Sequence, residues 1–488
     1  MTERGWRLAG YGILAAWAVV MLTARRTDAI TDDWQGWRQA DTAAIARNFV
    51  DEDADPLRPR IDWRGDGPGY VETELQLYPA LVATMARVTG DVVRPGQLVS
   101  LACVVLACGL LWRALARRFG DGPGLVGLIA ALSMQGTIVA STTIQPDPLA
   151  FLAFTIGWLA FLEDVARPTR RALATWVIAT AVAGLVKPTT LELGLAQVVY
   201  VAAARRELLR RPRLWLAWAA VLATVGGYLL YARTLYVDYG NTFGVLSGGD
   251  SKLPTAAALA SVTAWRELAR YAIIWGVGVL AVPAALYLAI TRRLTAEELA
   301  LAVAAKVLVL VAFRYTSSTF GTHYHLPHVV VGAWLTAHAA THLPRPRLVL
   351  ALVAAAGLVL GARAVRFVDA LPRQPETVLG EQLAALARPG ALVVVRARAE
   401  GYSRAWHTVN NFQDPRVFWL SRTRGWVVPS DLAGSAAIAD YARRGARYYV
   451  HVAQHPVDAD LAAWLTAHAH RVAAGDAGAI YDLGLAPR

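Results

Sequence analysis

The residues best suited to chemistry lie in one segment near the N-terminus, which reads GWRQADTAAIARNF over 36–49. Asp41 supplies a carboxylate, and Arg38 and Arg47 are cations close to it in sequence. Arginines can bind a phosphate while a neighbouring carboxylate takes a proton. The pattern also fits an ordinary cap, because Asp41 precedes a short helix predicted over 42–49, where Asp accepts hydrogen bonds from free amides. The segment alone leaves both roles open.

Other ionisable groups stand at the ends of apolar runs. Asp147 lies between two prolines, Lys187 precedes a proline, and the polar run over 313–327 holds Arg314, Tyr324 and a His-x-His pair, His323 and His325. Such groups at a membrane boundary are functional candidates, because leaving them near hydrocarbon is costly. A set of solvated loops would have the same composition. The two histidines could also bind a metal, although the loop offers no clear third ligand.

The elements that position these residues are apolar helices. The chain has 488 residues, of which 56% are hydrophobic and only 17% are charged. The excess falls in uncharged runs, and repetition of such runs predicts a polytopic α-helical membrane protein. The clearest runs cover 98–111, 125–144, 214–230, 272–290 and 348–360. The first stretch, over about 6–24, is interpreted as a retained helix rather than a signal peptide.

The distribution of charge predicts how the chain crosses the membrane. The formal net charge is +12, and arginines cluster in short connectors that alternate with connectors carrying acids. Cytoplasmic loops carry such an excess of arginine, so the charge indicates topology and not a nucleic-acid partner. With the N-terminus inside, about eleven helices follow. A long acidic loop over about 28–80 then lies outside, with Tyr78–Val88 at the membrane interface.

The composition changes after Arg366. Short apolar runs over 391–395, 448–452 and 479–481 alternate with helical patterns over 377–386, 436–444 and 458–468. This alternation predicts a small C-terminal α/β soluble domain. The predicted division is a transmembrane module over 1–365 and a domain over 366–488 on the same side as the acidic loop.

At this point the sequence resembles a known family. The first loop, with WRQADTAAIARNF followed by GYVETELQLYPAL, is similar to bacterial membrane glycosyltransferases of the GT-C superfamily. The similarity is greatest to the family 39 branch of protein O-mannosyltransferases and aminoarabinose transferases. Three short motifs, IQPDPLAF, LVKPT and THYHLP, occur in the matching order, as does a C-terminal domain that includes RVFWLSRTRGW.

The resemblance implies transfer of a sugar from a polyprenyl-phosphate donor, at the periplasmic face of a bacterial inner membrane. An acidic residue of the first outer loop would be the general base on the acceptor hydroxyl. The family often has an Asp-Glu pair there, and this sequence has Arg38-Gln39 at that place. We therefore assign the base to Asp41, with Asp33 and then Asp32 as alternatives.

The resemblance also gives the other candidates a role. Lys187 suits the leaving lipid phosphate, or is a lysine that reaches past apolar surface to water. Arg38, Arg314, His323, Tyr324 and His325 would contact phosphate or sugar. Glu72 and Glu74, on one side of an extended segment, would hold sugar hydroxyls or a cation, or form a solvated edge. Asp147 matches a position that some of these enzymes use for a divalent metal, or caps a helix that starts at Pro148, which we favour.

The alternative function is a multi-spanning transporter or flippase of a lipid-linked or anionic solute. Transporters more often carry charges at mid-membrane and paired broken helices. Here no convincing repeat is present, and Lys306 is the main charge well inside a predicted span. The hypothesis of a scaffold protein would not explain the Trp-Arg-Gln-Ala-Asp-Thr cluster. The sugar stays open, as does the acceptor, which would be a glycan, a lipid or a protein hydroxyl.

Overall fold

The computed structural model describes residues 3–24, 30–249, 251–453 and 457–484. The chain forms two compact units, each assembled from separate segments. We call the first the helical unit; it comprises Met1–Arg26, Gly96–Tyr228 and Lys252–Ala370. The second, the mixed unit, comprises Thr27–Pro95, Leu229–Ser251 and Leu371–Arg488. Residues 28 and 29 of the predicted outer loop lie outside the described residues.

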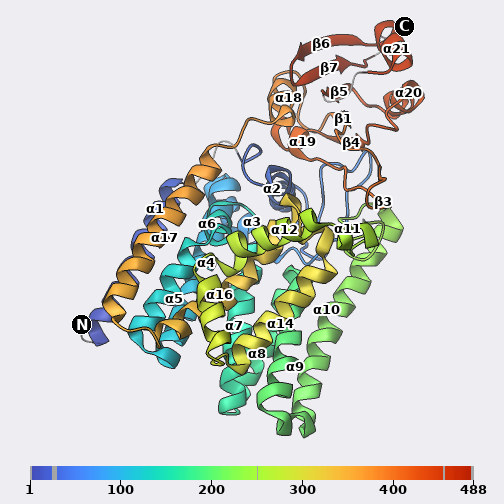
Figure 1. The fold of residues 1–488 in the computed structure, drawn as a ribbon. Coiled ribbons are helices and arrows are strands. Elements are labelled where there is room, and N and C mark those ends of the chain that lie inside the picture. The colour runs from blue at the N-terminus through green and yellow to red at the C-terminus, as the bar shows by residue number, and fades with distance from the viewer. Residues whose placement is uncertain (1–2, 25–29, 250, 454–456, 485–488) are drawn as a thin grey trace. The chain divides into compact units, whose positions relative to one another are not determined.

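The helical unit is built on long apolar helices that run side by side (Figure 1). Within the described part of the chain, five helices are long and apolar enough to cross a membrane. They are α1 (Glu3–Ala24), α4 (Val93–Phe119), α7 (Asp147–Ala166), α10 (Pro212–Tyr239) and α17 (Pro346–Asp369). The protein is therefore a multi-pass membrane protein, as predicted.

Two of the predicted straight spans are bent. The run over 125–144 forms α5 (Asp121–Ser133) and α6 (Gln135–Thr142), which meet at 62°. The run over 272–290 divides into η3 (Ala272–Val277), which continues α12 (Val262–Tyr271), and α13 (Ala281–Ile290), and these parts meet at 99°. Gly278, at that bend, has a φ of +87°, a conformation that favours glycine. Counting each bent pair as one span gives up to seven in the described residues, so the predicted eleven is not confirmed.

Shorter helices complete the helical unit: α8 (Arg170–Val186), α9 (Glu192–Ala204), α11 (Ala256–Ala260), α14 (Ala296–Val311), α15 (Phe313–Thr316) and α16 (Val329–Ala340). 3-10 helices join them: η1 (Pro188–Leu191), η2 (Arg206–Arg210) and the longer η4 (Thr319–His328). Large side chains, among them Trp112, Trp158, Trp176 and Phe161, are fully buried in its core. Their close packing stabilises the association of the helices, because no hydrophobic effect drives helices together within lipid.

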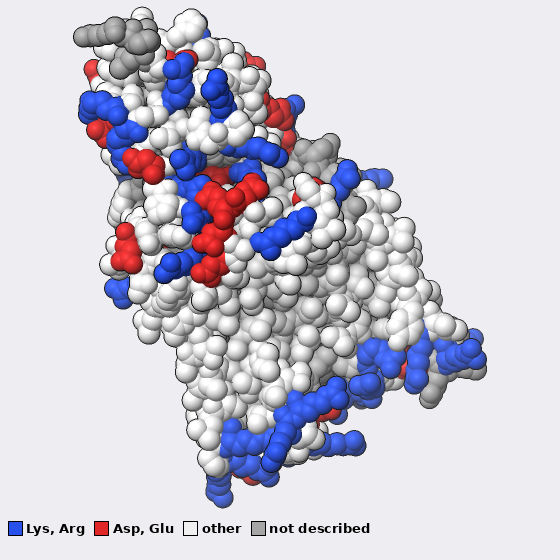
Figure 2. Space-filling view, turned by 180° about the vertical axis from the view of Figure 1, so that it is seen from behind, with Lys and Arg blue, Asp and Glu red and all other residues white. Residues whose placement is uncertain are grey.

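The arginine connectors gather at one end of the helical unit. Arg118 at the end of α4 pairs with Glu297 at the start of α14, at 3.2 Å. Arg213 at the start of α10 pairs with Asp164 near the end of α7, at 2.6 Å. Figure 2 shows basic side chains along this end and a surface almost without charge next to it. This separation is the one expected when arginine connectors lie on the cytoplasmic side.

The mixed unit contains a five-stranded sheet in the order β4-β1-β5-β7-β6. The strands are β1 (Leu392–Arg396), β4 (Arg424–Val428), β5 (Tyr448–Val452), β6 (His470–Gly475) and β7 (Gly478–Asp482). A separate antiparallel pair is formed by β2 (Tyr402–Ser403) and β3 (Thr408–Val409). β1 lies parallel to β4 and β5, whereas β7 is antiparallel to β5 and β6. The predicted strands correspond to β1, β5 and β7, and the predicted helices to α18 (Pro375–Ala384), α20 (Ser435–Arg443) and α21 (Ala459–His468).

The first loop shares a core with the C-terminal region. It forms α2 (Gly36–Asp51) and α3 (Leu77–Thr89), and Ile45 and Phe49 of α2 are buried in one cluster with Leu379. That cluster also holds Val417 and Phe418 of α19 (Arg416–Ser421). The structure thus groups the first loop with residues after 371, whereas the sequence prediction assigns it to the module over 1–365.

Candidate functional site

Asp41 lies inside a helix and not at its start. α2 begins at Gly36, after Gln35, which has a left-handed backbone with φ 53°. The helix predicted over 42–49 therefore starts six residues earlier, and Asp41 falls in its second turn. Free amides occur only in the first turn of a helix, so the capping role considered for Asp41 is excluded.

The carboxylate of Asp41 is buried and has one hydrogen bond. The residue is 5% exposed, and its Oδ1 accepts a hydrogen bond of 2.9 Å from the indole Nε1 of Trp63. Burial raises the pKa of Asp41 well above its usual range, against the lowering effect of this hydrogen bond. The nearby carboxylates of Asp414 and Asp62 raise the pKa further, and Arg38 lowers it.

The other candidate acids of the loop are engaged in holding its backbone. Asp33 accepts a bond of 2.7 Å from the amide of Trp34 and one of 3.2 Å from the side chain of Gln39. Asp32 accepts a bond of 2.7 Å from the amide of Gln374. These contacts occupy the two alternatives, so Asp41 stays the better candidate for a base.

Arg38 and Glu74 form an ion pair, a contact that the sequence did not predict. A guanidinium nitrogen of Arg38 is 3.5 Å from a carboxylate oxygen of Glu74, and both side chains are about 15% exposed. The backbone oxygen of Arg38 accepts a bond of 2.9 Å from the Thr42 hydroxyl, one turn along α2. A partly open ion pair of this kind can exchange partners with an anionic or hydroxylated ligand.

Glu72, by contrast, is fully buried and holds a second segment of the unit. Its Oε1 accepts bonds of 2.9 and 3.1 Å from the amides of Leu246 and Ser247, and its Oε2 accepts one of 2.7 Å from the Thr242 hydroxyl. A parallel bridge also joins Glu72 and Thr242 through the backbone. With these donors satisfied by one carboxylate, the geometry favours a positioning role for Glu72 over direct contact with a substrate.

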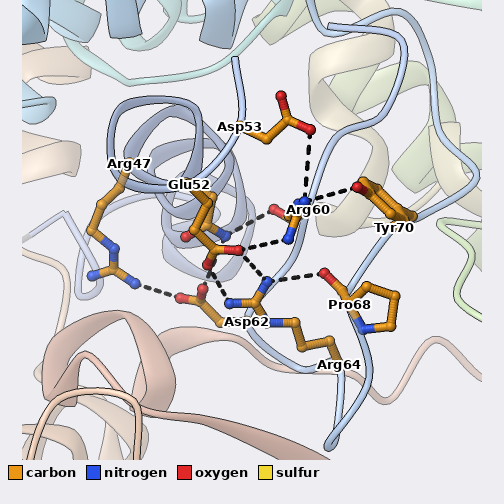
Figure 3. Close-up of polar contacts among 9 residues, drawn as sticks. Arg47, Glu52, Asp53, Arg60, Asp62, Arg64, Pro68 and Tyr70 are labelled. Carbon is orange, nitrogen blue, oxygen red and sulfur yellow. Dashed lines mark hydrogen bonds and ion pairs between the residues drawn. The ribbon is translucent and has the colours of Figure 1, made fainter. Parts of the chain in front are cut away.

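A network of arginines and carboxylates stabilises the first loop (Figure 3). Arg47 contacts Asp62 at 2.5 Å, its guanidinium lies 4.6 Å from the ring centroid of Trp419, and Asn48 donates to Asp62 at 3.1 Å. Figure 3 also shows Arg60 and Arg64 converging on Glu52. These pairs fix the irregular chain over 56–69 that carries Trp63.

A second charged network lies in the C-terminal part of the same unit. Arg416 is 2.6 Å from Asp414 and 3.0 Å from Glu376, and Arg398 contacts Glu376 at 2.5 Å. Burial raises the pKa of Glu376, and although burial opposes it, Arg416 holds the pKa of Asp414 below its usual range. Since Asp414 also acts on Asp41, the C-terminal region contributes charge to the surroundings of the candidate base.

In the helical unit, the structure brings together candidates from three separate motifs. The amine of Lys187 is 3.1 Å from a carboxylate oxygen of Asp147, and it lies 4.9 Å from the ring centroid of Tyr324. Lys187 follows the last residue of α8 and Asp147 is in the first turn of α7, so each charge also complements its helix dipole. The N-cap of α7 is Pro146, so the favoured assignment of Asp147 as the cap residue is wrong.

The remaining polar candidates adjoin this pair. Tyr324 lies 4.4 Å from His323 and 5.8 Å from Tyr315 between ring centroids, and the Arg314 guanidinium is 6.0 Å from the Tyr315 centroid. We call Asp147, Lys187, Arg314, His323 and Tyr324 the Lys187 cluster. It joins the IQPDPLAF, LVKPT and THYHLP motifs at one place.

His325 lies apart from this cluster in its contacts. It is fully buried, its Nε2 is 3.0 Å from the backbone oxygen of Thr316, and burial lowers its pKa to about 3. The imidazole is therefore neutral at physiological pH and offers no positive charge to a phosphate. Its neighbour His328 contacts Glu192 at 3.2 Å, and this buried pair joins η4 to the start of α9. The geometry favours a structural role for His325.

The proposed metal role of Asp147 has little support in the arrangement of side chains. Among the described residues, no group of three or more His, Cys, Asp or Glu side chains is placed to hold a metal ion. Asp147 instead pairs with a lysine, whose positive charge opposes a cation at the same carboxylate. No step of the proposed reaction is assigned to a metal.

Comparison with known proteins identifies the fold. A family model described as dolichyl-phosphate-mannose-protein mannosyltransferase matches residues 76–231. The crystal structure of ArnT from Cupriavidus metallidurans in the apo state superposes with a TM-score of 0.70, at 16% identity and with both chains covered completely. The chain has the GT-C fold. The resemblance stated from the first-loop motif is thereby confirmed at the level of the fold.

Two further GT-C structures support this assignment. ArnT bound to undecaprenyl phosphate gives a TM-score of 0.64 at 15% identity, again over all of both chains. The arabinofuranosyltransferase AftD from Mycobacteria gives 0.54 at 15% identity, over all of this chain and 40% of that one. Comparison with curated protein sequences finds no match.

Sequence reasoning missed the residues that surround Asp41. Trp63 lies in the irregular stretch over 56–69, where no periodic pattern marks a buried side chain. The run Ile61-Asp62-Trp63-Arg64 was a usable signal, since it places an aromatic ring between charged residues in a chain rich in proline and glycine. Asp414 and Glu376 gave no such signal, because only the fold brings them to the first loop.

Proposed function

We propose that this protein transfers a sugar from a polyprenyl-phosphate donor to an acceptor hydroxyl at the outer face of a bacterial inner membrane. The GT-C fold supports the class of reaction. The ArnT structure with bound undecaprenyl phosphate supports the class of donor by analogy. The arginine connectors at one end of the helical unit support a cytoplasmic N-terminus, and we infer that the opposite end, with the Lys187 cluster, faces outward.

The observation that carries the proposal is the environment of Asp41. A general base works best when its pKa lies near the operating pH, and burial raises the pKa of Asp41 in that direction. The one hydrogen bond to the Asp41 carboxylate comes from Trp63. Among the described residues, no ion pair neutralises the charge of this carboxylate. The carboxylate is therefore able to take the proton of an acceptor hydroxyl as the oxygen attacks the anomeric carbon.

The Lys187 cluster is suited to the leaving phosphate. Displacement of a lipid phosphate develops negative charge on the leaving oxygen, and preorganised cations stabilise it. Lys187 is buried and held by Asp147 and Tyr324, so its amine keeps a fixed position. His323, next to Tyr324, and Arg314, next to Tyr315, would add contacts to the phosphate or the sugar. Arg38 and Glu74 would contact the sugar or acceptor in the mixed unit.

The test uses the full-length protein in membranes, with a radiolabelled polyprenyl-phosphate sugar as donor. Asp41→Asn keeps the size and the hydrogen-bond acceptor but removes the base, and we expect transfer to fall by about 10²-fold or more. Lys187→Met is expected to weaken use of the donor. Asp55→Asn is the control, since that carboxylate belongs to an exposed turn of the first loop.

Full activity of Asp41→Asn would refute the assignment of the base. If wild-type protein in vesicles moved labelled lipid or solute across the membrane without transferring sugar, the transporter alternative would hold instead.

A further inference from the structure

We propose that α11 and α12 form a membrane-surface helix that lies within the outer phospholipid headgroup layer, with Arg266 and Arg270 on lipid phosphates. This lipid-contacting surface includes neither Asp41 nor any residue of the Lys187 cluster. It is independent of sugar transfer.

The first support is the direction of the chain. The helix Val262–Val277, which contains α12 and η3, meets α13 at 99°. α13 then runs to the connector that holds Arg292 and Arg293. If α13 runs along the bundle towards the arginine end, a near right angle turns α12 into the plane of the membrane, at the other end. In Figure 1, α12 runs across the long helices and not along them.

The second support is which side chains are exposed. Val262 is 83% exposed, Trp265 is 41% exposed and Leu259 of α11 is 44% exposed. On α12, positions 262, 265, 266, 269 and 270 form one exposed stripe, because residues three and four apart share a helix face. Single exposed apolar residues are ordinary, but apolar side chains that share a stripe with arginines fit the boundary between headgroups and acyl chains.

Contacts of α12 also fix the helix to the bundle. Leu268, outside the stripe, is buried, and the partly exposed Trp265 ring of the stripe contacts Phe313 edge-on, with centroids 5.0 Å apart. The Trp265 Nε1 donates a bond of 2.8 Å to the backbone oxygen of Leu259, which ties α11 to α12. Hydroxyl caps start both helices, since Thr255 accepts from the amide of Ala258 and Ser261 from that of Ala264. These contacts hold α11 and α12 in a defined arrangement.

Charge favours phospholipid over a protein partner. Arg266 and Arg270 are 73% and 59% exposed in their side chains, and both pair with Glu267, which is 24% exposed. One carboxylate cannot neutralise both guanidinium groups, so the stripe keeps a net positive charge. Tryptophan and arginine beside aliphatic side chains are typical of membrane interfaces. The apolar surface next to the stripe belongs to a membrane bundle, so lipid already surrounds it.

The depth of single labels tests the proposal. The two native cysteines, Cys103 and Cys108, are buried, so a fluorophore can be attached to Val262→Cys, with half-buried Ala264→Cys as the matched control. The full-length protein is reconstituted in vesicles of phosphatidylethanolamine and phosphatidylglycerol. Quenchers are lipids with a nitroxide near the headgroup, and aqueous iodide. We expect the lipid quencher to lower emission at position 262 by about two-fold, with little effect at 264 or from iodide.

Efficient quenching by iodide at position 262, without quenching by the lipid nitroxide, would overturn the proposal and favour a surface that faces water or a protein. The double variant Arg266→Gln/Arg270→Gln, carrying the label at 262, should lose much of its lipid quenching. Unchanged quenching in that variant would exclude a role for the two arginines. Measured transfer of sugar does not enter either result.

Discussion

At the scale of single residues, Asp41 is distinguished by a hydrogen bond from an aromatic side chain. Trp63 donates to it at 2.9 Å, and the same ring packs edge-on against Phe243, with centroids 5.6 Å apart. The indole is therefore fixed by packing on one side while it supports the carboxylate on the other. Such a donor favours the ionised form of an acid, so it keeps the pKa of Asp41 from rising still further.

Replacing Trp63 tests this relation. Trp63→Phe keeps a ring against Phe243 but removes the donor, so the pKa of Asp41 should rise and its ionised fraction at neutral pH should fall. A hydrogen bond to a charged group contributes about 1.5–3 kcal/mol, so we expect a loss of roughly tenfold or more in transfer. The acidic limb of the pH profile of kcat/KM should move to higher pH. Trp464→Phe in α21 is the control, and an unmoved limb would contradict the role given to Trp63.

Stability gives an independent test of the buried charge. A folded-state pKa raised above its unfolded value means that ionising Asp41 destabilises the fold, so its contribution is lost as pH rises through the folded pKa. Asp41→Asn should therefore unfold no more easily than wild type above neutral pH. Asp62→Asn removes the partner of Arg47 and should cost about 3 kcal/mol. Thermal unfolding in detergent between pH 5 and pH 9 distinguishes the two, and a less stable Asp41→Asn at high pH would refute the claim.

Residue identities were easier to predict than residue surroundings. The sequence placed Asp41, Arg38, Lys187 and Asp147 among the candidates because their types suit the chemistry. It could not predict that Asp147 pairs with Lys187 across 40 positions of sequence, since that contact depends on how α7 packs beside α8. It also left Glu72 as a substrate contact, where the fold gives it three backbone and hydroxyl donors.

At the scale of elements, the segment over 241–247 depends on the first loop. Glu72→Ala would remove the carboxylate that accepts from the amides of Leu246 and Ser247, and a hydrogen bond to a charged group contributes about 1.5–3 kcal/mol. We expect faster hydrogen exchange at these two amides, with little change in β1. Glu381→Ala, which alters an exposed pair in α18, serves as the control. Unchanged exchange at 246 and 247 would mean that other contacts hold the segment.

Glycines at helix crossings offer a second test. A Cβ on Gly332 of α16 would lie 1.7 Å from the backbone oxygen of Val277, whereas one on Gly226 of α10 would meet nothing within 4 Å. Gly332→Ala should therefore force α16 away from η3 and lower the thermal stability of the protein in detergent. Gly226→Ala should leave it unchanged or raise it slightly, by about 0.5–1 kcal/mol through helix propensity. Equal stability of the two variants would contradict the close approach of these elements.

The bends explain why hydropathy alone predicts straight spans where the structure has bent ones. A window over 272–290 averages apolar residues from η3 and α13, so it cannot detect the change of direction at Gly278. Strand β6 was missed for a different reason. β6 is exposed along most of its length, so its residues lack the apolar alternation that marks a buried strand.

At the scale of the whole molecule, the charge pattern predicts topology. Single cysteines at Thr291, next to the arginine connector of α13, and at Ala463, in α21, should react differently with a membrane-impermeant maleimide on intact cells. We expect Ala463→Cys to be labelled from outside, and Thr291→Cys only after permeabilisation. The native cysteines are buried and give a low background. Labelling of both positions from the same side would contradict an odd number of spans between them.

The assembly of the mixed unit from three segments has a consequence for biosynthesis. The backbone of Asp62 accepts a bond from Gly425, Asp32 accepts one from Gln374, and Arg47 donates to Trp419. Their partners leave the ribosome more than 300 residues later, after the whole membrane bundle. The first loop must therefore remain incompletely folded while the helices insert. A chain that stops short of 371 would have its membrane helices in place and still lack an ordered setting for Asp41.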